Sequence, residues 1–116
     1  MSIGSISYIE IGGGARTEAS GAFFSKLFGW QYKAMGDAGN GWFQLPDIKA
    51  GLHPNDLGFG IFPFFEVADL SEAVTKVREL GGEASDPGPA EPGFGRFSFC
   101  SDPDGIKFGL HVRTDA

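Results

Sequence analysis

The chain has 116 residues, enough for one compact domain with its own core and too few for two independent domains. Its formal net charge is -6, and its 9 Lys and Arg residues are scattered, so nucleic acid and anionic membrane surfaces are disfavoured as partners. With one cysteine, no long apolar run and no basic secretory pattern, the sequence favours a cytoplasmic protein.

The first half of the sequence predicts a strand, a helix and three short strands. The segment "ISYIEI" alternates between two faces, which is typical of a strand. In the following helix, Ala19, Phe23 and Leu27 recur at helical spacing, Thr17 is the expected N-cap and Gly29 the expected end. Turn-forming residues then separate three predicted strands, at 30–35, 42–45 and 49–53.

The second half repeats this order. A strand over 61–67 precedes a helix in which Asp69 is the expected N-cap, Glu72 completes a capping box and Gly81 ends the helix. Three strands are predicted to follow, at 82–85, 96–100 and 106–112. Tyr8 and Phe62 stand at matching positions, so the repeat is about 54 residues long. We therefore expect a single domain of two modules, about 1–56 and about 57–116, with a pocket on the concave surface between them.

Four segments in register then identify a family resemblance. They are "AFFSKLFGW", "FEVADLSEAVTKVRELGG", "PGFGRF" and "SDPDGIKFGL". Together they resemble the vicinal oxygen chelate superfamily, which includes glyoxalases, bleomycin-resistance proteins and extradiol dioxygenases, and within it a branch of small glyoxalase-like proteins. The resemblance implies an α+β fold of two βαβββ modules that form a curved mixed sheet around a cavity, with the helices on the outer face. A homodimer is the expected assembly.

The resemblance also implies four positions for the ligands of a divalent metal. The implied His positions fall at Tyr8 and Phe62, and the implied Glu positions fall at Gly51 and Gly109. This sequence has no suitable ligand at any of them, so we expect no metal cofactor. The less favoured alternative is a shifted metal site built from residues two or four positions further along the same strands. Its ligands would be His53, His111, Glu10 and Glu66.

The remaining side chains expected to face the cavity predict a binding site for an aromatic or apolar small molecule. The predicted ligand-binding residues are Tyr8, Trp42, Phe62, Phe64, Ser98, Lys107 and His111. Cys100 is interpreted as a small buried hydrophobic residue.

Whether the chain is an enzyme stays open at this point. The alternative to a binding protein is a glyoxalase-like lyase or a ring-cleaving dioxygenase. Such an enzyme would use the shifted metal site or a metal-free acid-base pair formed by His111 with Glu10 or Glu66.

Overall fold

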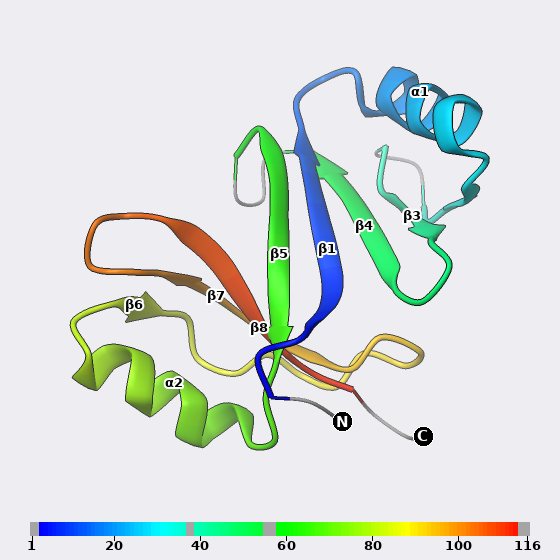
Figure 1. Cartoon of the computed structure of the whole chain (residues 1–116). Helices are drawn as coiled ribbons and strands as arrows, with labels where there is room; N and C mark the ends of the chain where they lie inside the picture. Colours follow the sequence, from blue (N-terminus) through cyan, green and yellow to red (C-terminus); the bar gives the residue numbers. More distant parts are fainter. Residues whose placement is uncertain (1–2, 37–38, 55–57, 114–116) are drawn as a thin grey trace. The chain divides into compact units, whose positions relative to one another are not determined.

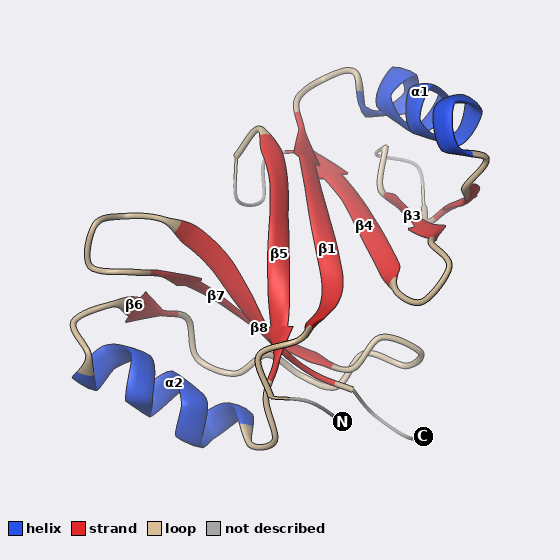
Figure 2. Cartoon of the chain, in the orientation of Figure 1, coloured by secondary structure: helices blue, strands red, loops and turns tan. Residues whose placement is uncertain are grey.

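The computed structural model describes residues 3–36, 39–54 and 58–113. Its elements are β1 (Ile6–Gly13), α1 (Thr17–Phe28), β2 (Gln31–Ala34), β3 (Gly41–Gln44), β4 (Lys49–Pro54), β5 (Gly60–Glu66), α2 (Leu70–Glu79), β6 (Glu83–Ala84), β7 (Arg96–Ser101) and β8 (Lys107–Val112) (Figure 1). The α+β class and the repeated order of one strand, one helix and three strands are confirmed. Figure 2 colours the helices blue and the strands red.

The chain divides into two compact units. We call residues 8–62 the first half, and residues 1–7 together with 63–116 the second half. The expected module boundary near residue 56 lies outside the described residues. No helix in the described ranges is both long and apolar enough to cross a membrane.

In the first half, the strand order is β2-β3-β4-β1. The β2–β3 and β3–β4 pairs are antiparallel, and β4 runs parallel to β1. One face of this sheet forms a core of Ile11, Phe43, Ala50 and Leu52, against which Phe24 of α1 packs. Alternation along each strand therefore directs the neighbouring residues to the opposite face.

Helix α1 differs from its prediction in two respects. Its N-cap is Arg16, and no side chain caps the helix there, so the expected cap at Thr17 is wrong. The predicted apolar stripe is also wrong, because Phe23 and Leu27 are 59% and 58% exposed. Gly21 lies against the sheet instead, where a Cβ atom would come 3.5 Å from Leu52. The expected end is confirmed, since Gly29 adopts the left-handed conformation.

In the second half, the strand order is β5-β8-β7-β6, with β5 and β8 parallel and the other pairs antiparallel. The Asp69 carboxylate accepts a hydrogen bond from the Glu72 backbone N–H at 2.9 Å, which confirms the predicted N-cap of α2. Leu70 and Val74 of this helix pack on Cys100 and Leu110. We call the face of this sheet that carries Cys100 and Leu110, and that packs against α2, the helix side of the second half.

Candidate functional site

The candidate site lies on the face of the first half's sheet that points away from α1. Four residues paired directly across β1, β4, β3 and β2 stand on that face in one row, in the order Glu10, Gly51, Trp42 and Lys33. We call this surface the polar face. Its side chains are Tyr8, Glu10, Lys33, Asn40, Trp42, Lys49 and His53.

Gly51 leaves a gap in the row that three polar side chains enter. A Cβ atom at Gly51 would lie 2.8 Å from Glu10 Oε1 and 3.2 Å from His53 Nε2, and it would overlap the Tyr8 hydroxyl. The hydroxyl, carboxylate and imidazole therefore converge where the family resemblance implies a metal-binding glutamate. No longer side chain fits at Gly51 while these groups keep their positions.

His53 is held between an amide and a carboxylate. Its Nδ1 lies 3.0 Å from Asn40 Oδ1. An amide oxygen only accepts hydrogen bonds, so Nδ1 carries the hydrogen and donates it. Its Nε2 then faces Glu10 Oε2 at 3.8 Å, and Glu10 is only 3% exposed. At 3.8 Å the two atoms are beyond hydrogen-bond distance, so the contact between the imidazole and the carboxylate is electrostatic.

Trp42 is flanked by two lysines. The Nζ atoms of Lys33 and Lys49 lie 5.4 and 4.9 Å from the centroid of its ring. Both distances are within the range of a cation–π interaction, which contributes about 0.5–1 kcal/mol at an exposed site. The sequence alone does not indicate Lys33, Lys49 or Asn40 as site residues, because each lies on a short strand or turn whose pairing partners the sequence leaves open.

The second half places a ring where the first half places polar groups. Phe64 pairs with Gly109 as Glu10 pairs with Gly51. A Cβ atom at Gly109 would overlap the Phe64 ring, which is fully buried and packs edge-on against Phe97 and Phe99. We therefore place Phe64 in the packing of this half rather than at a surface that binds a ligand.

His111 is a buried, neutral histidine with both ring nitrogens engaged. Its Nε2 lies 2.6 Å from the Phe94 carbonyl and its Nδ1 lies 2.7 Å from the Ser7 hydroxyl. The carbonyl only accepts, so Nε2 donates to it and Nδ1 accepts from Ser7. Burial lowers the pKa of His111, with Arg113 adding to the effect, while the bond to Phe94 and the nearby Glu66 oppose it.

The other predicted residues of the second half occupy separate surroundings. Glu66 pairs in register with His111, and its carboxylate lies 3.2 Å from Arg113 Nε. The predicted face of Ser98 is wrong: it pairs with Leu110 on the helix side, and its hydroxyl donates to the Ser85 carbonyl at 2.7 Å. Lys107 is exposed at the start of β8.

Phe62 and Cys100 are the last two residues that the sequence singles out. Phe62, in the first half, is partly buried, and its ring would lie 3.7 Å from a Cβ atom at Gly12. Cys100 is buried in the α2 cluster, and burial raises the pKa of its thiol, so it acts as the small hydrophobic residue that the sequence indicates.

The positions implied for a metal do not fit one. The Tyr8 hydroxyl occupies the place of a side chain at Gly51, and the Phe64 ring occupies that place at Gly109. Within the described ranges there is no group of three or more His, Cys, Asp or Glu side chains that could hold a metal ion. Of the shifted set, the first half brings Glu10 and His53 together, and the second half pairs Glu66 with His111.

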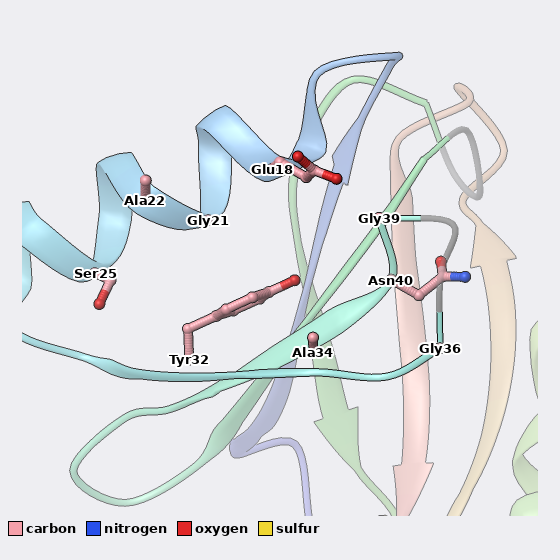
Figure 3. Close-up of a pocket in the computed structure, with 9 residues that line it drawn as sticks. All are labelled: Glu18, Gly21, Ala22, Ser25, Tyr32, Ala34, Gly36, Gly39 and Asn40. Atoms are coloured by element: carbon pink, nitrogen blue, oxygen red, sulfur yellow. The ribbon is translucent and has the colours of Figure 1, made fainter.

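A separate cavity of about 390 Å³ lies on the α1 side of the first half. Figure 3 shows the Tyr32 side chain beneath α1, with Gly21 and Ala22 on the helix above it. Burial raises the pKa of the Tyr32 hydroxyl, and the carboxylate of Glu18 adds to the rise. The cavity is lined by Glu18, Gly21, Ala22, Ser25, Tyr32, Ala34, Gly36, Gly39 and Asn40. Asn40 thus borders this cavity and also holds His53 on the polar face.

Solved structures with the same fold come from proteins of different activity. The chain is similar to methylmalonyl-CoA epimerase of Streptomyces coelicolor in complex with 2-nitronate-propionyl-CoA, with a TM-score of 0.71, 16% identity and coverage of 99% of this chain and 98% of that one. It is similar to 2,2',3-trihydroxybiphenyl 1,2-dioxygenase of Sphingomonas wittichii, with a TM-score of 0.69 and 16% identity, over 98% of this chain and 42% of that one. At these identities the similarity establishes the fold.

A third similar structure carries a family description and no activity. It is a glyoxalase/bleomycin resistance protein/dioxygenase superfamily member from Vibrio splendidus, with a TM-score of 0.62, 19% identity and coverage of 91% and 97%. A search of the curated proteins finds no match. A family model matches residues 14–110, most of the sequence. The chain belongs to the Glyoxalase/Bleomycin resistance protein/Dioxygenase superfamily.

Proposed function

We propose that the chain binds a planar aromatic small molecule on the polar face of its first half, without the metal of catalytic relatives. The observation that supports this most directly is the gap at Gly51, where Tyr8, Glu10 and His53 converge in place of a metal-binding glutamate. Trp42 stands beside that gap in the same row. A ligand ring stacked on Trp42 would bring its polar group toward the side chains that fill the Gly51 gap.

Substituting the stacking residue tests this proposal. We expect Trp42→Ala to weaken binding of planar aromatic probes, such as 2-naphthol, about tenfold, because the stacking surface is lost. The measurement is calorimetric titration in the presence of a metal chelator. Trp30→Phe is the matched control, since Trp30 packs on Phe28 and Phe43 on the α1 side. Equal losses in both variants, or binding that disappears with the chelator, would contradict the proposal.

A metal-free enzyme is the second candidate, supported by the Glu10–His53 pair. The sequence indicates His111 as the imidazole of such a pair, but both nitrogens of His111 are engaged inside the second half. His53 has its Nε2 directed at a buried carboxylate and its Nδ1 fixed by Asn40. Such a pair can accept a proton from a substrate and return it. This candidate is a lyase or isomerase that moves one proton and requires no change of oxidation state.

Proton exchange tests the second candidate separately from binding. Methylmalonyl-CoA, which is bound by a structural neighbour, has an acidic hydrogen beside its thioester carbonyl and serves as the probe. We expect the chain to exchange this hydrogen for deuterium in D2O, measured by proton NMR, and Glu10→Gln to slow the exchange at least about a hundredfold. Glu83→Gln, a change at an exposed residue, is the control. Exchange that is absent, or equal in both variants, would leave the chain as a binding protein.

A homodimer and a cytoplasmic location stay predictions. Three exposed apolar side chains on α1, Phe23, Leu27 and Phe28, support the homodimer, because a group of this kind on one helix often lies at an interface.

A further inference from the structure

We infer that the ligand of the polar face is a planar organic anion, with its negative group held by Lys33 and Lys49 and a hydrogen-bond donor at its other end. This inference rests on the proposed function and names the class of molecule that the same site would take. The order of charges along the row and the two lysines beside Trp42 support it.

The row has opposite character at its two ends. Glu10 stands on β1 and Lys33 on β2, with Gly51 and Trp42 between them. Neighbouring strands are about 4.8 Å apart, so the Gly51 gap and Lys33 are separated by about 10 Å. A fused two-ring aromatic acid has this length. Its rings would cover Trp42 while its two polar ends reach the gap and the lysines.

The two lysines favour an anion. Lys33 ends the row on β2, and Lys49 stands on β4 opposite Tyr8, with its Nζ near the same indole ring. Two ammonium groups directed at one indole ring repel each other, and the ring attracts both only weakly. A carboxylate placed beside them is attracted by both charges. The positive charge of the two lysines is a local feature, because the chain as a whole has a net charge of -6.

The opposite end favours a donor and disfavours a second anion. The Glu10 carboxylate is buried, and its Oε1 faces the gap at Gly51. A ligand hydroxyl there can donate to this oxygen, whereas a ligand carboxylate would be repelled by it. The row therefore orients the ligand, with the hydroxyl toward β1 and the anionic group toward β2.

Calorimetric titration of the full chain with two matched probes tests the inference. The probes are 6-hydroxy-2-naphthoate and its neutral analogue 6-hydroxy-2-naphthamide. We expect the wild type to bind the anion about tenfold more tightly than the amide, because two partly exposed charge pairs each contribute modestly. The double variant Lys33→Gln/Lys49→Gln is expected to abolish this preference, so that it binds both probes with equal affinity. Lys26→Gln/Lys76→Gln, which removes the same charge from the two helices, is expected to retain the preference.

The outcomes separate this inference from the proposed function. Equal affinity of the wild type for both probes, or a preference that survives Lys33→Gln/Lys49→Gln, would overturn the anion assignment. The binding function would still stand in that case, provided that Trp42→Ala weakens binding of both probes. Failure of both probes to bind, or binding that is indifferent to Trp42→Ala, would overturn the binding function and the anion assignment together.

Discussion

Replacing Phe64 with alanine is expected to lower the free energy of unfolding by about 3–5 kcal/mol, measured by urea denaturation followed by circular dichroism. The Phe64 side chain is fully buried, and its ring centroid lies 5.5 Å from that of Phe97 and 5.7 Å from that of Phe99. Because Gly109 provides no side chain beneath the ring, truncation would leave a cavity that the neighbouring backbone cannot fill.

Two comparisons make this prediction specific to the packing over Gly109. Phe23→Ala, at a side chain that is 59% exposed, is expected to change the free energy of unfolding by no more than about 0.5 kcal/mol. Gly109→Ala should destabilise the wild type by about 1–3 kcal/mol, because its methyl group would overlap the Phe64 ring. In the Phe64→Ala background, Gly109→Ala should lower the free energy of unfolding by much less. Additive effects of the two substitutions would show that the ring does not occupy this space.

The sequence predicts the order of the elements well because short-range signals determine it. Asp69 followed three residues later by Glu72 marks the start of α2, and the structure has the cap there. Glycine at position 29 marks the end of α1. These signals depend on the backbone of one turn and require no knowledge of the partner elements.

Which face a segment buries is harder to predict. In "FSFC", Phe97 and Phe99 point to one side of β7 and Ser98 and Cys100 to the other, and either pair could face a helix. The small pair faces α2, where Cys100 meets Leu70 and Val74. Likewise, α1 places Gly21 rather than Phe23 against the sheet. Close approach between helix and sheet favours the small residue in both halves, and that preference appears only in the packed structure.

The sequence predicted some residues of the candidate site and missed others. From the ligand positions that the resemblance implies, alternation along each strand directed Tyr8, Glu10 and His53 to the cavity. Trp42 was predicted as a ligand-binding residue at the rim. The sequence did not reveal that Asn40 holds His53 or that Lys33 stands beside Trp42, because both contacts depend on strand register. Gly51 and Gly109 stand at matching positions of the two halves. Matching glycines accept polar side chains in the first half and an aromatic ring in the second.

Acid is expected to destabilise the protein through His111. Burial lowers its pKa in the folded chain below the ordinary value of 6.5, so between these two values the unfolded chain binds more protons than the folded chain. The stabilisation is therefore complete above about pH 6.5 and is lost as the pH falls through the window below it. One proton accounts for a slope of at most about 1.4 kcal/mol per pH unit. Denaturation by urea at a series of pH values measures this slope.

Two variants assign the acid effect to this residue. His111→Gln removes the titrating ring while its amide can still donate to the Phe94 carbonyl and accept from Ser7, so its stability should depend less on pH in that window. His53→Gln removes the other histidine of the chain and should keep the acid sensitivity of the wild type. If His111→Gln lost stability with acid as steeply as the wild type, the destabilisation would arise from other groups. The comparison also separates the two histidines by role, since His111 stabilises the second half from within and His53 faces the proposed ligand.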